Sequence, residues 1–204
     1  MKLIGGIFLI LFWSSVTGFG QIKKGTFLLG GTLGLAKNMV PNNTFPSPQF
    51  TDEREKSFIA GPQAALFIAD NIAVGLSVNY EHTKIRRFDA MQNIYDPIRT
   101  QTLSLGPLVR YYHFLNADFA VFGQAKALYS EDFNHRDYNQ FTAALAPGLV
   151  YFVTPKIGLE LNIGGLTYEY AYSKRPDDYT FTFHNVDLRL LNGLQTGISF
   201  YLGR

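Results

Sequence analysis

The sequence of 204 residues contains no cysteine. The chain can therefore form no disulfide and no thiolate metal site, and thiol-based catalysis is excluded. Its 18 Lys and Arg stand against 16 Asp and Glu, so there is no strong excess of positive charge of the kind that nucleic-acid binding requires. No apolar run after the N-terminal region reaches the roughly 20 residues of a transmembrane helix. We therefore expect no nucleic-acid partner, no helical membrane span after the N-terminal region and no cofactor.

The N-terminal residues have the features of a secretory signal peptide. Lys2 is followed by an apolar stretch, Leu3–Trp13, and by small residues that end at Gly20. The alternative is a membrane anchor, but the apolar stretch is shorter than a spanning helix. We predict that residues 1–20 are a signal peptide and that residues 21–204 form one domain. Removal of Lys2 leaves 17 of the 18 basic side chains against 16 acidic ones, so the net charge is +1.

Apolar and polar residues alternate along most of the remaining chain. In the stretch Ile72–Glu81, Ile72, Val74 and Leu76 share one parity and Ala73, Gly75 and Ser77 the other. A period of two with β-branched and aromatic residues predicts β-strands. We predict eight such segments, over residues 24–36, 54–68, 72–84, 99–113, 118–129, 139–153, 157–170 and 181–202. A change of parity at Gly164-Gly165 predicts a bulge in the seventh.

The connections between the predicted strands alternate between short and long. The short ones are residues 69–71, 114–117 and 154–156, and the long ones are residues 37–53, 85–98, 130–138 and 171–180. Outer-membrane barrels show this alternation of periplasmic turns and extracellular loops. Most predicted strands are also longer than the five or six residues usual in soluble sheets. The pattern predicts an all-β fold, an eight-stranded antiparallel up-and-down transmembrane β-barrel.

Three prolines recur at similar places in the predicted hairpins. They stand in the pairs Gly61-Pro62, Gly106-Pro107 and Ala146-Pro147, and all three share the parity of the apolar set. Proline cannot donate to a sheet ladder. We therefore expect each to face outward, at a bulge or at an unpaired amide position.

The polar parity carries charges of both signs, which we expect to face the interior. An eight-stranded barrel leaves room for little more than side chains, and buried charges persist only when paired. We predict a plugged lumen that holds a charge network of Glu81, Arg110, Lys126, Glu160, Asp187 and Arg189. A soluble lipocalin-like carrier, with its apolar face inside, is an alternative that parity alone does not exclude.

Aromatic residues are expected to form girdles at the two membrane interfaces. Near the short turns these are Tyr111, Tyr112, Phe114, Phe119, Tyr151, Phe152 and Tyr201. Near the long loops they are Phe58, Tyr80, Tyr129, Phe141 and Tyr168.

The last strand ends in a pattern of polar-x-Gly-x-x-apolar-x-apolar residues. Gln195, Gly197, Phe200 and Leu202 carry this pattern, which resembles the C-terminal insertion signal of bacterial outer-membrane barrels. With the signal peptide, the four hairpins and the stretch from Gly61 to Tyr80, the chain resembles the small outer-membrane β-barrel proteins of Gram-negative bacteria. It is similar to the OmpA/OmpX-like and porin-like barrels, and its leader resembles those of Bacteroidetes.

The resemblance implies an outer-membrane location and an eight-stranded fold. We also expect a monomer that contacts outer-membrane lipid and the barrel assembly machinery. In a departure from the OmpA type, we expect no periplasmic peptidoglycan-binding domain. The resemblance implies no activity. Catalysis of lipid modification is the enzymatic alternative, with His82 or a loop group around His135 as candidates, but no triad can be assembled from the sequence. We expect a non-enzymatic barrel with a structural or surface-interaction role through its four extracellular loops. The surface partner is not indicated by any motif.

Overall fold

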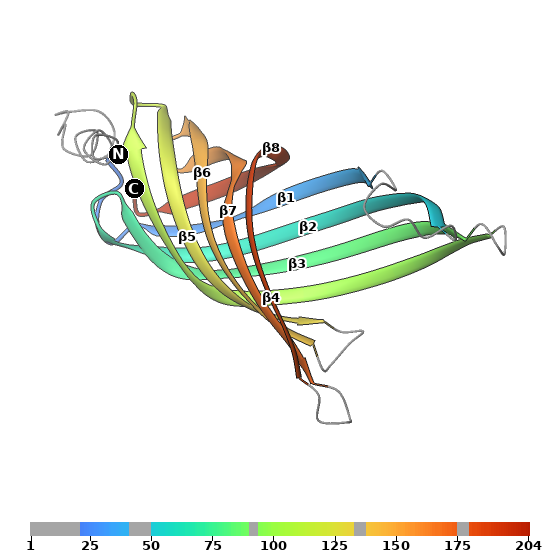
Figure 1. The fold of residues 1–204 in the computed structure, drawn as a ribbon. Coiled ribbons are helices and arrows are strands. Elements are labelled where there is room, and N and C mark those ends of the chain that lie inside the picture. The colour runs from blue at the N-terminus through green and yellow to red at the C-terminus, as the bar shows by residue number, and fades with distance from the viewer. Residues whose placement is uncertain (1–20, 41–49, 90–93, 133–137, 175–179) are drawn as a thin grey trace, which may run out of the picture.

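The computed structural model describes residues 21–40, 50–89, 94–132, 138–174 and 180–204. Over these residues the chain forms a closed antiparallel barrel in which each strand pairs with its neighbours in sequence and β8 returns to β1 (Figure 1). The strands are β1 (Phe27–Val40), β2 (Phe50–Ala69), β3 (Ile72–Asp89), β4 (Ile94–Phe114), β5 (Phe119–Asp132), β6 (Tyr138–Thr154), β7 (Ile157–Lys174) and β8 (Thr180–Leu202). The predicted all-β, eight-stranded barrel is confirmed. No helix in these ranges is both long enough and apolar enough to span a bilayer.

The two ends of the barrel differ. We call the end with the short β2–β3, β4–β5 and β6–β7 connections the turn end, and the opposite end the loop end. At the turn end a two-residue turn, Asp70-Asn71, joins β2 to β3, and Asn71 adopts a φ of 63°, a conformation that Asn tolerates well. At the loop end the strands run farther than predicted, so that β4 begins at Ile94 and β3 ends at Asp89. The predicted long connections are correspondingly shorter.

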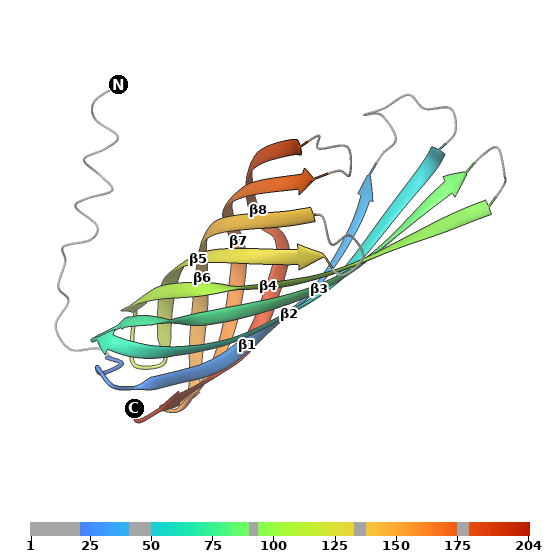
Figure 2. The same cartoon turned by 90° about the horizontal axis from the view of Figure 1, so that it is seen from below.

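Beyond the closed part of the barrel the strands separate into two groups. Both ribbon views show the outer parts of β1–β4 diverging from those of β5–β8 (Figures 1 and 2). β1 pairs with β8 only from Phe27 to Gly34, whereas β1 itself continues to Val40. The loop-end parts of β1 and β8 are thus each paired on one side only in the described structure.

Irregularities lie where the sequence predicted them. Between β7 and β8 the register shifts after Asn162, and Gly164 adopts a φ of 95°, which confirms the bulge. The prolines also lie at breaks. The β2–β3 ladder skips Pro62, the β4–β5 ladder skips Pro107, and the β6–β7 register shifts at Pro147. All three prolines are exposed, as expected.

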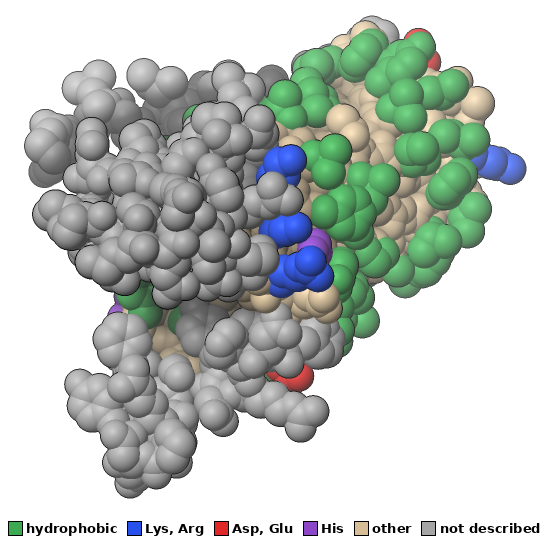
Figure 3. Space-filling model, turned by 90° about the vertical axis from the view of Figure 1, so that its right-hand side faces the viewer, with side chains coloured by type: hydrophobic (Ala, Val, Ile, Leu, Met, Phe, Trp, Pro, Cys, Tyr) green, Lys and Arg blue, Asp and Glu red, His purple; other side chains and the backbone are tan. Residues whose placement is uncertain are grey.

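The outside of the barrel is apolar and much of its inside is polar. Outward positions carry exposed large apolar side chains such as Leu33, Leu76 and Leu188, which are 60%, 58% and 65% exposed. Figure 3 shows apolar side chains spread over the barrel surface. Inward positions include Ser77 and Ser199, which are fully buried. A soluble carrier barrel would show the reverse arrangement.

The prediction for the turn-end girdle is wrong for four of its seven aromatics. Tyr111, Phe119 and Tyr151 face outward and are exposed, but Tyr112, Phe114, Phe152 and Tyr201 are buried inside the barrel. The reason is the period of two, because inward positions alternate with outward ones. Tyr112 and Phe114 share the parity of Arg110. At the loop end, Phe58, Tyr129, Phe141 and Tyr168 are exposed on outward positions, while Tyr80 is half-buried.

Candidate functional site

The turn end of the interior is filled by a packed cluster of apolar and aromatic side chains. We call this group the aromatic plug: Ile22, Leu28, Ala65, Phe67, Ala73, Tyr112, Phe114, Ala120, Phe122, Val150, Phe152 and Tyr201. Its rings lie close together, with 5.1 Å between the centroids of Phe152 and Tyr201 and 5.4 Å between those of Phe114 and Phe152. Such spacing is typical of favourable aromatic contacts. Buried apolar side chains thus occupy the interior at this end.

The segment before β1 contributes to the aromatic plug. Ile22 is fully buried in the aromatic plug although it precedes the first strand. Its backbone N–H donates to the side-chain Oδ1 of Asn71, and the N–H of Asn71 donates to the carbonyl of Ile22. The N–H of Gly25 donates to the carbonyl of Phe67. These hydrogen bonds hold the segment against the first short turn.

On the loop-end side of the aromatic plug, Arg110 and Glu160 form an ion pair across the interior. Arg110 Nη1 lies 2.8 Å from Glu160 Oε1, and both side chains are fully buried. The guanidinium also donates to Gln124 Oε1 and to the Tyr112 hydroxyl, and its carbon lies 4.4 Å above the Phe122 ring. A buried charge is tolerated when ion pairs and hydrogen bonds compensate its lost hydration. Arg110 has both.

Further polar groups extend this network along the interior. The Ser199 hydroxyl donates to Glu160 Oε1, and Gln124 Nε2 donates to Asn162 Oδ1. The predicted charge network contains Arg110 and Glu160 but not Gln124, Asn162 or Ser199. Gln124 has the parity expected to face the interior, and Asn162 and Ser199 have inward parity as well. All three are uncharged, and the predicted network consists of charged side chains alone.

Three further charges of the predicted network, Glu81, Lys126 and Asp187, line a cavity nearer the loop end. The structure thus brings Arg110 together with Glu160, and it places the three cavity-lining charges nearer the loop end. The side chain of Arg189 lies outside the part of the chain that the structure describes; its backbone pairs with Gly165.

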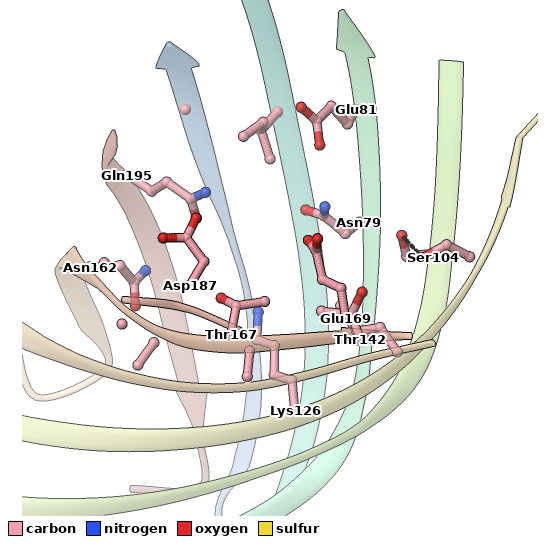
Figure 4. A pocket seen from close by; sticks show the side chains of 18 of the residues that line it. Asn79, Glu81, Ser104, Lys126, Thr142, Asn162, Thr167, Glu169, Asp187 and Gln195 are labelled. Carbon is pink, nitrogen blue, oxygen red and sulfur yellow. Dashed lines mark hydrogen bonds between the residues drawn. The ribbon is translucent and has the colours of Figure 1, made fainter. Parts of the chain in front are cut away.

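The cavity occupies the loop-end half of the interior and has a volume of about 590 Å³. Its described ionisable side chains are Glu81, Glu169, Asp187 and Lys126, so carboxylates outnumber ammonium groups by three to one. Hydroxyl and amide groups supply most of the remaining polar lining (Figure 4). Asn162 reaches it from β7, and the side-chain Nδ2 of Asn162 has no hydrogen-bond partner among the described residues. The cavity is suited to a small polar molecule.

The cavity also reaches the outer surface between β1 and β8. Leu35 and Leu194 line it, yet they are 81% and 47% exposed on outward positions. They lie just beyond Gly34 and Gln195, the last register pair that joins the two strands. The opening therefore coincides with the end of the β1–β8 ladder.

The candidates for a catalytic or metal site are the two histidines considered for lipid modification and the acidic residues. No group of three or more His, Asp or Glu in these ranges is placed to hold a metal ion. His82 is half-buried on β3, and its Nδ1 has no hydrogen-bond partner in the described part of the chain. His135, the other candidate for lipid modification, lies outside the described residues.

The residues of the predicted insertion signal lie on both faces of β8. Phe200 and Leu202 face outward and are 44% and 50% exposed. Gln195 faces the cavity, and a Cβ at Gly197 would collide with the backbone of Gly31 on β1. The outward pair is accessible from outside the barrel, while Gly197 allows β1 and β8 to pack closely.

Comparisons with known proteins support the fold alone. No family model matches the sequence, and no curated protein matches it. The outer membrane protein OprG from Pseudomonas aeruginosa is similar in structure, with a TM-score of 0.51 and 12% identity over 89% of this chain and 98% of OprG. Neisserial surface protein A gives a TM-score of 0.41 and 11% identity over 89% of this chain and 98% of its own. The β domain of the Bordetella autotransporter BrkA gives 0.42 and 8% identity over 88% of this chain and 100% of that domain.

Proposed function

We propose that the protein is a non-enzymatic integral β-barrel of the Gram-negative outer membrane that acts at its loop end. Its lumen is closed by the aromatic plug, and its polar cavity and extracellular loops face the exterior. The observation that carries this proposal is the apolar outer surface of a barrel whose interior contains buried charges. A water-soluble barrel would gain nothing by exposing this surface.

The closed sheet fits the hydrocarbon core of a membrane. Backbone groups in a bilayer need partners within the protein, and a closed barrel supplies them. The outward residues of β2 are apolar or small from Phe58 to Ile68, with Pro62 among them. This length matches the roughly 9 to 11 residues with which a tilted strand crosses a bilayer.

The plug argues against a conducting pore. Rings from five strands, together with Ile22, fill the turn end, and the Arg110–Glu160 pair lies on their loop-end side. Ions that enter from the loop end would reach the cavity and stop there. A role in binding at the outer surface therefore fits the interior better than a role in diffusion does.

Two alternatives are less well supported. A lipid-modifying enzyme needs a base and a nucleophile within hydrogen-bond reach, and the Nδ1 atom of His82 has no hydrogen-bond partner among the described residues. A soluble lipocalin-like carrier needs an apolar lining, whereas the cavity is lined largely by hydroxyl, amide and charged groups.

Export and assembly complete the proposal. Residues 1–20 would be removed as a signal peptide, and Gln195, Gly197, Phe200 and Leu202 would be read by the barrel assembly machinery. The mature chain would be a monomer among outer-membrane lipids, of the OmpA/OmpX-like, Bacteroidetes type. The four extracellular loops expected between the strands at the loop end would supply the contacts with a surface partner.

The absence of cysteine allows a direct test. Single cysteines placed in turn at residues 149 to 153 of β6 would be treated with a lipid-soluble maleimide in isolated outer membranes. Leu149, Tyr151 and Val153 face outward, whereas Val150 and Phe152 are buried. We expect labelling at the three outward positions and little at the two inward ones. Uniform labelling by a water-soluble maleimide at the outward positions would contradict the membrane location.

A further inference from the structure

Three basic residues occupy adjacent register positions on neighbouring strands near the loop end. Lys56 of β2 pairs with Lys84 of β3, and Lys84 pairs with Arg99 of β4. We call Lys56, Lys84 and Arg99 the basic row. Because neighbouring strands lie about 4.8 Å apart, the three Cα atoms span roughly 10 Å across the sheet.

The basic row lies on the outer face of the barrel. Lys56 shares its parity with exposed Phe58, and Arg99 shares its parity with exposed Leu103. Lys56 and Arg99 are exposed and Lys84 is half-buried. Figure 3 shows Lys and Arg side chains gathered where the apolar surface ends.

The position of the basic row along the strands matches the headgroup region of a bilayer. On β2 the outward apolar stretch ends at Phe58, and Lys56 is the next outward residue. On β4 the stretch ends at Leu103, and Gln101 and Arg99 follow. Long basic side chains at such a boundary place their charges among the lipid phosphates.

The described residues supply no ion pair to the two lysines of the basic row. Like charges directly opposite each other on neighbouring strands are destabilising. In the described part of the chain neither Lys56 nor Lys84 forms an ion pair, and the outward neighbours of Lys84 include His82 rather than a carboxylate. Arg54 and Arg86 form a further register pair nearer the loop end, which extends the series of basic positions. An anion from outside the protein would relieve the repulsion.

We propose that the basic row binds the phosphate of a phosphomonoester lipid in the outer leaflet. This inference rests on the proposed membrane location. A phosphomonoester carries a charge of about −1.5 to −2 near neutral pH, which suits several cations better than the single charge of a phosphodiester does. Arg99 would offer a planar pair of donors, and the two lysines would offer compact charges.

The far side of the barrel provides a matched control. At the loop end of β5, β6 and β7 the outward positions carry Tyr129, Phe141 and Tyr168 instead of basic residues. Phe58 and Phe141 are 41% and 42% exposed, so they are equivalent positions for a probe. Only Phe58 lies beside the basic row.

The test uses an introduced tryptophan and brominated lipids, which quench its fluorescence on contact. Trp13 is the only tryptophan, so a Trp13→Phe background leaves Phe58→Trp or Phe141→Trp as the sole fluorophore. Each full-length protein is reconstituted in phosphatidylcholine vesicles that contain a minor fraction of brominated phosphatidic acid or, in parallel, of brominated phosphatidylcholine. The ratio of the two quenching levels measures local enrichment of the phosphomonoester.

We expect enrichment of roughly fivefold or more at Phe58→Trp, because one cation near an anionic lipid contributes about that factor. We expect no enrichment at Phe141→Trp. The triple variant Lys56→Gln, Lys84→Gln, Arg99→Gln should remove the enrichment at Phe58→Trp. If it does not refold, the single variant Lys84→Gln should reduce the enrichment.

Three outcomes would overturn the inference. Equal quenching by the two brominated lipids at Phe58→Trp would show no preference for the phosphomonoester. Equal enrichment at Phe58→Trp and Phe141→Trp would show that the barrel attracts the phosphomonoester lipid in general and that the basic row is not a specific site. Absence of quenching by brominated phosphatidylcholine at both positions would overturn the membrane location as well, so the two proposals can fail separately.

Discussion

Arg110 and Glu160 stand fifty residues apart in the sequence, on β4 and β7, and their side chains meet across the barrel interior at 2.8 Å. Neither side chain is exposed to solvent. The pair lies between the aromatic plug and the cavity, so it separates a closed apolar layer from an open polar one. This division of the interior underlies the proposed role at the loop end.

Removal of one member of this pair should destabilise the barrel strongly. Glu160→Gln leaves the Arg110 guanidinium buried without its counter-ion, and breaking a buried pair typically costs about 3–5 kcal/mol. The free energy of unfolding, measured by urea titration in lipid vesicles, should fall by about this amount. Glu131→Gln, which changes an exposed carboxylate, should leave the free energy almost unchanged. Equal stability of the two variants would contradict the structural role of the pair.

Opening the aromatic plug should create conductance. Tyr112→Ala with Tyr201→Ala removes two fully buried rings from the turn end. In planar bilayers we expect the unmodified protein to show no steady channel and the double variant to show one. Tyr111→Ala alters an outward ring on the same strand and should behave as the unmodified protein does. A large steady conductance of the unmodified protein would contradict the plugged lumen.

Two glycines that look alike in sequence should respond differently to alanine. A Cβ at Gly106 would collide with the backbone carbonyl of Ala127 on the neighbouring strand, whereas a Cβ at Gly123 would meet no atom within 4 Å. Gly106→Ala should therefore lower the free energy of unfolding by about 1–3 kcal/mol, as overpacking does. Gly123→Ala should change it by no more than about 0.5 kcal/mol. A larger loss of stability for Gly123→Ala than for Gly106→Ala would contradict the close contact between Gly106 and the backbone of Ala127.

Much of the fold was predictable because a barrel strand repeats every two residues. Parity separates Leu76 from Ser77 and puts Arg110 and Glu160 on the same face of the sheet. The membrane-barrel interpretation then assigns this face to the interior. The same rule, applied to Tyr112 and Phe114, would have placed them inside. Their residue type and their position near a turn instead favour a girdle. In the structure both side chains face inward, as their parity requires, and their rings form part of the aromatic plug.

Other features depend on contacts that no local pattern encodes. Ile22 lies before the first strand and is buried because Asn71, far along the chain, holds its backbone. The end of the β1–β8 ladder at Gly34 depends on how far two strands from opposite ends of the chain stay together. Both are properties of the closed sheet.

The outward residues at the end of β8 should affect assembly more than stability. Phe200→Ala with Leu202→Ala alters the exposed part of the predicted insertion signal. We expect less protein in the outer membrane and more in the periplasm, measured by fractionation and immunoblotting. Val186→Ala with Leu188→Ala changes two exposed residues of the same strand outside the signal and serves as the control. If both variants lose the same amount of protein from the outer membrane, the effect reflects the loss of apolar surface in general and not the loss of an insertion signal.

The most direct test of the account is the gel migration of the protein from fractionated membranes, with and without boiling. We predict that the protein lies in the outer-membrane fraction and that the unboiled sample migrates differently from the boiled one, because a closed barrel resists detergent until it is heated. A protein found in the soluble fraction with the same migration in both samples would contradict the membrane barrel.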